Sequence, residues 1–197
     1  MSNAKSSLGP QPLLYPEPAF LIACYAEDGK PNVMTVAWGG ICSSDPLSLT
    51  VSIRTAPYSH ACILARKAFT VNIASEKMMV GMDFAGIVSG RKIDKFAATG
   101  WTAVKAEKVD APYIAESPVI LECRLSQTVQ VGIHTMFVAE ILDVKADKSC
   151  LDETGKFPEI EKIKPIVFDS GSKHYYGVGR RLGRAFSCGK ELIEKNG

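Results

Sequence analysis

Small polar and basic side chains form three groups along this 197-residue chain. The first holds Asn32, Thr35, Trp38, Cys42, Ser43 and Ser44, the second Arg54, Thr55, Tyr58 and Ser59, and the third Ser89, Gly90, Arg91, Lys92, Asp94 and Lys95. Hydroxyls and backbone N–H groups can bond the polar edge of a flat ring, and a helix N-terminus with Arg or Lys can hold a phosphate dianion. The groups therefore suit a flat ligand that carries a phosphate.

Each group also has an ordinary structural explanation. Hydroxyls before a helix usually cap it, and Trp38 would serve equally well in a hydrophobic core. The charged residues at 91–95 would serve on a solvated face. Residue type alone favours these explanations.

Motifs for other chemistries are missing from the sequence. The loop Gly177–Gly183 has its third glycine one position late for a dinucleotide fingerprint, and no Walker A or Gly-x-Ser-x-Gly motif occurs. His60, His134 and His174 are far apart and have no Cys or carboxylate at ligand spacing, so we expect no metal site. A lone Cys–His nucleophile stays open, although no spacing supports it.

The elements that must position these groups read mostly as strands. Apolar runs and alternation predict strands at 19–25, 32–38, 47–53, 68–73, 119–131, 135–144 and 165–169, and short helices at 59–67, 78–85 and 94–97. Gly39-Gly40 should break or bulge the second strand. Residues 145–164 should form an exposed excursion, and the tail 182–195 should be mixed and partly helical. About seven strands linked by turns indicate a mostly antiparallel barrel.

Composition limits the function classes. A hydrophobic fraction of 46% supports a sizeable core, and a net charge of +2 gives no basic footprint for nucleic acid. No apolar run approaches the roughly 20 residues of a membrane span, and Met1–Pro10 has no signal-peptide core. The six cysteines form no CxxC pair, which favours reduced thiols in the cytoplasm. We expect a flexible segment at 1–14 and one domain at 15–197.

Several segments, in order, resemble the flavin reductase-like FMN-binding split-barrel family, and within it the flavoredoxins. They are Gly29–Pro46, Leu49–His60, Ala68–Ser75, Ser89–Phe96, Gly132–Phe137 and Lys164–Phe168. The resemblance covers nearly the whole chain, and the ordered set is more specific than any one segment. It implies a mostly β fold, an antiparallel FMN-binding split β-barrel with a few short helices, and a homodimer with noncovalent FMN near its interface.

The same resemblance implies the residues that contact FMN. The ring and ribityl side would use Asn32, Met34, Thr35, Trp38, Cys42, Ser43 and Ser44, and the phosphate side Arg54, Thr55 and Ser59 with Lys92 or Lys95. Cys42 is expected to be small, buried and reduced. His134 lies in a loop where reductases of the family commonly carry Gly-Asp-His, but Ile133 replaces the acidic residue.

The implied function is electron transfer between a donor and an acceptor through bound FMN, with an electron-carrier protein as a partner. Two alternatives stay open: an NAD(P)H-dependent flavin or ferric reductase, and a non-enzymatic flavin-binding protein. His134 and His174 are candidates for the donor side, together with the basic residues Lys173, Arg180 and Arg181. Electron transfer through a flavin requires no protein acid or base, so no catalytic residue is assigned.

Overall fold

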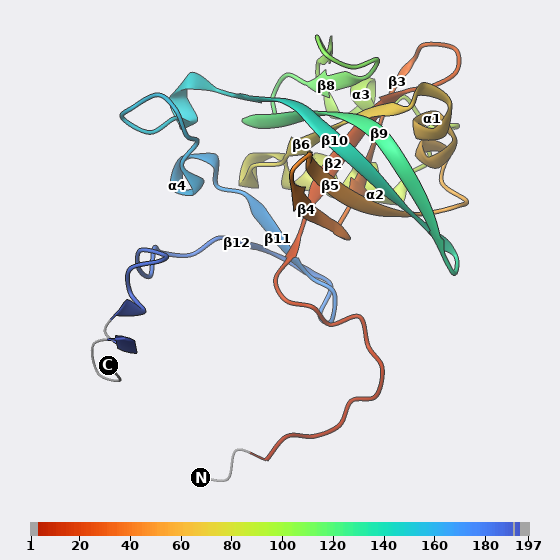
Figure 1. Ribbon diagram of the computed structural model, residues 1–197. Helices are drawn as coiled ribbons and strands as arrows, with labels where there is room; N and C mark the ends of the chain where they lie inside the picture. The colour runs from red at the N-terminus through yellow and green to blue at the C-terminus, as the bar shows by residue number, and fades with distance from the viewer. Residues whose placement is uncertain (1–3, 191, 194–197) are drawn as a thin grey trace.

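The computed structural model describes residues 4–190 and 192–193 (Figure 1). Its strands are β1 (Glu17–Pro18), β2 (Phe20–Tyr25), β3 (Pro31–Val36), β4 (Gly39–Ser44), β5 (Leu47–Arg54), β6 (Ala68–Ile73), β7 (Ala103–Lys105), β8 (Pro112–Ile114), β9 (Val119–Val131), β10 (His134–Ala146), β11 (Ile166–Asp169) and β12 (His174–Gly177). Its α-helices are α1 (Tyr58–Arg66), α2 (Met79–Ile87), α3 (Lys95–Thr99) and α4 (Ile160–Ile163), with 3₁₀ turns at Glu76–Met78 and Lys148–Cys150. The predicted strands and short helices are confirmed, with small shifts at their ends.

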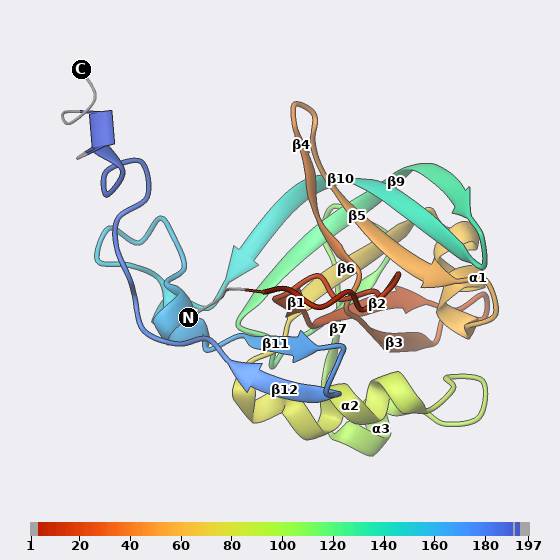
Figure 2. The same ribbon diagram turned by 90° about the horizontal axis from the view of Figure 1, so that it is seen from below.

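A seven-stranded antiparallel sheet in the order β3-β2-β6-β9-β10-β5-β4 forms the barrel. The edge strands β3 and β4 do not pair with each other, so the sheet curls without closing (Figures 1 and 2). Just beyond β3, the N–H of Ser52 donates to the carbonyl of Trp38 across 2.8 Å. The fold is the predicted split barrel.

The number of strands was underestimated: about seven were expected, and the described chain has twelve. Gly39-Gly40 breaks the second strand, as one of the two predicted outcomes, since β3 ends at Val36 and the glycines open a separate strand, β4. A Cβ on Gly39 would lie 2.6 Å from the carbonyl oxygen of Thr50, so this close backbone approach requires glycine. The strand at 165–169 is not the last, since β12 pairs with it.

Two apolar layers hold the barrel. One side of β2 places Ile22 and Cys24 in the barrel interior with Phe69 and Phe137. The other side of β2 packs Leu21 and Ala23 against α2 and α3, where Met82 and Phe96 are buried. Strand β2 is therefore buried on both faces, which accounts for its continuous apolar run. Figure 2 shows α2 and α3 side by side below β3.

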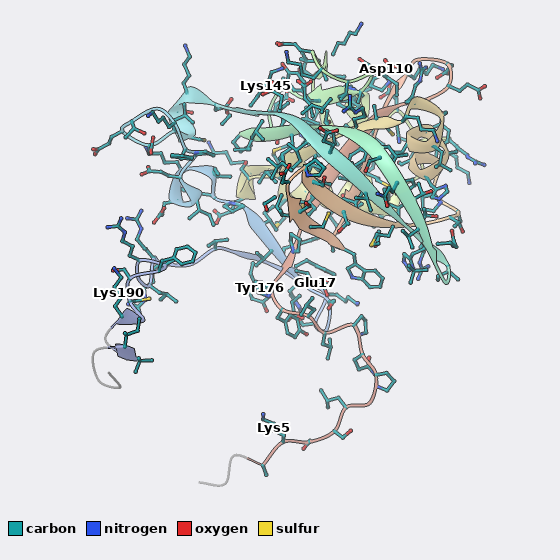
Figure 3. All side chains as sticks on the ribbon, viewed as in Figure 1. Lys5, Glu17, Asp110, Lys145, Tyr176 and Lys190 are labelled. Carbon is teal, nitrogen blue, oxygen red and sulfur yellow. The ribbon has the colours of Figure 1, made fainter. Side chains whose placement is uncertain are left out.

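Outside the barrel, β1, β11 and β12 form a small sheet. Figure 3 places Glu17 and Tyr176 at this sheet and Lys145 on the upper side of the barrel. The predicted excursion 145–164 contains a 3₁₀ turn and α4. The predicted tail helix is limited to Lys190 and 192–193, while 185–189 are turns and residues 191, 194 and 195 lie outside the described chain. Residues 1–3 of the predicted N-terminal segment also lie outside it. None of the described helices combines the length and apolar character needed to cross a membrane.

Candidate functional site

A cavity of about 480 Å³ lies between β3, the end of β5, the start of α1 and the loop after α2. Its lining residues are Met34, Arg54, Ala56, Pro57, Tyr58, Ser59, Ala85, Gly86, Ile87, Val88, Ser89, Gly90, Arg91 and Lys95. Four predicted site residues from distant parts of the sequence, Met34, Arg54, Ser59 and Lys95, thus meet here. The volume lies within the range of small-molecule sites.

The start of α1 supplies an anion-binding end to this cavity. Pro57 is the N-cap, no side chain caps the first turn, and Tyr58 and Ser59 both line the cavity. First-turn N–H groups and the helix dipole attract negative charge. The guanidinium of Arg91 lies 5.7 Å from the centre of the Tyr58 ring, which keeps a cation at the same place.

Lys95 contributes a buried cation. Its side chain is 4% exposed, and its ammonium donates to the carbonyls of Val33 (2.8 Å) and Ala85 (2.7 Å). Desolvation lowers the pKa of Lys95 to about 8. An ammonium has three N–H donors, so one remains for an anion in the cavity that Lys95 lines. Lys92, by contrast, is exposed.

The side chain of Asn32 lies between Ser59 and Gly90, and these three residues are called the cradle. The amide Nδ2 of Asn32 donates to the hydroxyl of Ser59 across 2.8 Å, and Asn32 is 4% exposed. Its Oδ1 is buried without a hydrogen-bond partner among the described residues. A Cβ on Gly90 would lie 2.1 Å from that Oδ1. An unsatisfied buried acceptor calls for a donor, and a ribityl hydroxyl near the phosphate of a flavin would supply one.

Four cavities form a series in which each shares lining residues with the next, and this series is called the cavity path. Tyr58, Gly90 and Arg91 also line a second cavity of about 260 Å³ that reaches Asn32 and Lys92. In the other direction, Gly86 and Ile87 also line a third cavity of about 240 Å³ with Thr35 and Phe168.

The path ends beside Trp38. Ala37 lines both the third cavity and a fourth of about 690 Å³, which contains Trp38 and Gly39. The Trp38 ring lies 5.0 Å from the ring of His134, which opens β10. The path therefore has a cationic end at Arg54, Arg91 and Lys95 and an aromatic end at Trp38, and the residues present fit a flavin with a terminal phosphate.

Some predicted residues have other roles in this chain. The Thr35 hydroxyl donates to the carbonyl of Met82 and so ties β3 to α2. The N–H of Thr55 donates to the carbonyl of Ile133 across 3.2 Å. Thr35 thus joins two elements that line the path and also lines its third cavity, whereas Thr55 joins the end of β5 to the β9–β10 turn.

The predicted residues on β4 do not line this path. Cys42, Ser43 and Ser44 belong to a hairpin that projects from the barrel (Figure 2), and none of them lines the four cavities. Cys42 is exposed, so the expectation of a buried thiol was wrong for the single chain. His174 is exposed at the start of β12 and lines none of these cavities.

The site residues expected from the sequence lacked two side chains and one segment. Tyr58 and Arg91 line two of the cavities, and the loop 86–90 forms one wall. Tyr58, Gly90 and Arg91 belonged to the polar groups of the sequence, but only the folded chain sets them beside Asn32. Glycine at 90 before two basic residues was the available signal.

Comparisons with known proteins find similar flavoproteins and electron carriers. The structure aligns with flavoredoxin of Desulfovibrio vulgaris (Miyazaki F) with a TM-score of 0.90 and 46% identity, covering 94% of this chain and all of that one. A high molecular weight rubredoxin of Moorella thermoacetica is 31% identical over 103 residues, 51% of this chain and 44% of that protein. An NADPH-flavin oxidoreductase of Streptomyces viridifaciens is 31% identical over 121 residues, 60% of this chain and 61% of that protein.

The family assignment rests on most of the chain. The sequence model of the flavin reductase like domain matches residues 13–174, which include every strand of the split barrel and most residues that line the cavity path. The chain therefore belongs to the flavin reductase-like family.

Proposed function

We propose that this protein binds FMN noncovalently along the cavity path and carries electrons between a donor and an acceptor. One observation carries the proposal. Arg54, Arg91, Lys95 and the uncapped start of α1 meet at one end of the cavity path, and the path reaches Trp38 at its other end. Bound FMN supplies reversible uptake of electrons. The chain's residues bind, orient and shield it.

The phosphate end would be held by several donors. Arg54 is exposed at the end of β5, Lys95 is buried, and Ser59 can donate its O–H because it accepts from Asn32. Charge-assisted bonds of this kind are stronger than neutral ones. Toward the ring end, Met34, Thr35 and Trp38 would line the flavin, with His134 beside Trp38.

The proposed donor is a small electron-carrier protein. In support, the alignment with flavoredoxin of Desulfovibrio vulgaris extends over nearly the whole chain, and a relative named as a rubredoxin aligns with about half of it. His174 and Arg180 are exposed, as is Arg181, which pairs with Glu161 across 3.1 Å. Basic side chains on this part of the chain would steer an acidic carrier. A cytoplasmic location is part of the proposal.

The function is tested on the purified protein. We expect a yellow protein whose flavin is released on denaturation and identified as FMN by chromatography. Stopped-flow reduction of the bound FMN by reduced rubredoxin should be fast and should slow as salt rises, because screening weakens steering. NADPH should reduce it slowly.

Two outcomes would change the conclusion. A colourless protein that also fails to bind added FMN would end the flavin proposal. Rapid, saturable reduction by NADPH would favour the NADPH-flavin oxidoreductase alternative, which one relative's name supports.

We also propose that two copies form a homodimer. Large apolar side chains are exposed on β4 and at the tip of the β9–β10 hairpin: Ile41 is 65%, Val131 58% and Ile133 63% exposed. A partner chain that contacts both projecting hairpins would cover these side chains. Both chain ends also extend away from the barrel, as Lys5 and Lys190 show in Figure 3.

We expect sedimentation at micromolar concentration to give twice the chain mass of 21.3 kDa. The double variant Ile41→Glu/Ile133→Glu should sediment as a monomer, because burying two carboxylates in an apolar contact is costly. Lys5→Glu is the control and should stay dimeric. A wild-type holoprotein that sediments as a monomer would rule the dimer out.

A further inference from the structure

A chain of hydrogen bonds runs from α1 to the tip of the β9–β10 hairpin. His60 Nε2 lies 2.8 Å from the Thr135 hydroxyl, and that oxygen lies 3.0 Å from Gln130 Oε1. Gln130 Nε2 then donates to the carbonyl of Gly132 across 2.7 Å. Thr135 is 5% exposed, so its hydroxyl depends on these protein partners.

The direction of each proton follows from the chemistry of the partners. A carbonyl oxygen can only accept, so Gly132 fixes the amide of Gln130 with Nε2 as donor and Oε1 as acceptor. The Thr135 hydroxyl must then give its one hydrogen to Gln130. Its oxygen is left to accept, so His60 must carry its hydrogen on Nε2.

The chain connects the two ends of the cavity path. His60 follows Ser59, which lines the cationic cavity in the first turn of α1. Thr135 follows His134, whose ring lies 5.0 Å from Trp38 at the aromatic end. Along β10, Thr135 and Phe137 are buried while His134 lies on the opposite face. Hydrogen bonds that fix the Thr135 side chain therefore also fix the orientation of β10 at this point, and with it the position of the His134 ring.

The surroundings of His60 fix its ring. The edge of the ring meets Phe137, with centroids 5.2 Å apart and planes at 62°. Its backbone N–H donates to the carbonyl of Pro57 across 3.1 Å. Burial lowers the pKa of His60 below its usual 6.5, which favours the neutral ring. A neutral ring carries its hydrogen on either Nδ1 or Nε2, and the chain of bonds selects the Nε2–H tautomer.

We propose that His60 is a positioning residue that, through Thr135 and Gln130, fixes the β9–β10 hairpin tip and so places His134 and Trp38 against the flavin. The part concerning the flavin rests on the FMN site proposed above, whereas the part concerning the hairpin does not. His60 itself need not touch the flavin. Its effect is carried by the hairpin.

The hairpin part is tested on the protein without flavin. Long-range ¹H–¹⁵N NMR correlations should show His60 with its hydrogen on Nε2. In His60→Leu, amide exchange at Thr55 and in the hairpin tip should quicken about fivefold to tenfold, equivalent to one neutral hydrogen bond. His60→Gln, which restores a terminal N–H donor, should return exchange toward the wild-type rate.

The control is Ser117→Ala, which removes a buried hydroxyl bond of 2.7 Å to the carbonyl of Ile73 at another place. It should lower stability without quickening exchange at the tip. If His60→Leu does not fold, Thr135→Val removes the hydroxyl that His60 contacts, and Thr135→Ser should keep the chain of hydrogen bonds intact. A hydrogen on Nδ1 of His60, or equal exchange in His60→Leu and His60→Gln, would overturn the proposal.

The flavin part is tested at saturating FMN. The visible circular dichroism of the bound flavin should change in His60→Leu and recover in His60→Gln, because the ring surroundings depend on the hairpin. Unchanged dichroism together with quickened exchange would confine His60 to a structural role and overturn the flavin part. Failure of the wild-type protein to bind FMN would instead refute the proposed function and leave the exchange result standing.

Discussion

Lys95→Met is expected to weaken FMN binding about tenfold to a hundredfold at pH 7, the loss of one charge-assisted bond of roughly 1.5–3 kcal/mol. Lys95 is 4% exposed, and two of its three N–H donors are held by the carbonyls of Val33 and Ala85. The third N–H is left for an anion in the cavity that Lys95 lines. Riboflavin, which has no phosphate, should lose much less affinity. Equal losses for both ligands would make Lys95 a structural residue only.

The pH dependence of binding gives the same residue a second signature. Burial lowers the pKa of Lys95 to about 8 in the free protein. A bound phosphate favours the charged ammonium and so raises that pKa, which means that binding takes up a proton above pH 8. FMN affinity should therefore be constant between about pH 7 and pH 8, where the phosphate is already a dianion, and fall as pH rises further.

The measurement is fluorescence titration of FMN and riboflavin from pH 7 to 9.5. In Lys95→Met the fall above pH 8 should vanish. Lys92→Met is the matched control, because Lys92 is exposed on the neighbouring cavity and should leave the fall in place. Riboflavin corrects for ionisation of the ring, which both ligands share. A fall that persists in Lys95→Met would assign it to another group.

The barrel could be predicted because its strands carry their own signals. Segments 119–131 and 134–146 are long β-rich runs around a glycine turn, and they form the longest pair of the sheet. Leu47–Arg54 alternates because one of its faces is buried. Such local patterns do not depend on distant contacts. They were enough to infer an antiparallel barrel.

The short strands could not be predicted, because they depend on distant neighbours. Gly39-Gly40 looks like a strand breaker, and only its approach to Thr50 makes it the start of β4. Strand β12 follows a turn at Asp169, whose carboxylate accepts from the N–H groups of Gly171 and Ser172. Its partner, β11, was predicted as the last strand of the chain. Tertiary pairing decided both cases.

Two site residues show the same limit at the level of side chains. The sequence places Lys95 in a charged run typical of a solvated face, yet α3 packs on β3 and buries it. Cys42 reads as a small site residue, yet it lies exposed on the projecting β4 hairpin. The burial of a single side chain depends on how helices and strands pack against each other. A local sequence pattern does not predict that packing.

Gly90→Ala is expected to reduce FMN affinity about tenfold to a hundredfold, the effect of overpacking by roughly 1–3 kcal/mol. A Cβ at this position would lie 2.1 Å from Asn32 Oδ1 and 3.1 Å from Tyr58 Cδ1. Asn32 cannot yield easily, because it is buried and its Nδ2 is bonded to Ser59. The new methyl group must therefore displace the cradle that the flavin would occupy. Gly179→Ala, where a Cβ would meet nothing within 4 Å, is the control and should bind FMN normally.

A double variant identifies the contact that causes this loss. If the methyl group acts by pushing Asn32, then Asn32→Ala/Gly90→Ala should bind FMN as weakly as Asn32→Ala alone, because the displaced side chain is already gone. The two effects would then be strongly non-additive, as expected for residues in contact. Isothermal titration of the two single variants and the double variant measures this directly. Fully additive losses would mean that the substitution at Gly90 acts through Tyr58 or the segment 86–91 rather than through Asn32. The flavin contact would then be assigned to that segment instead of to the cradle.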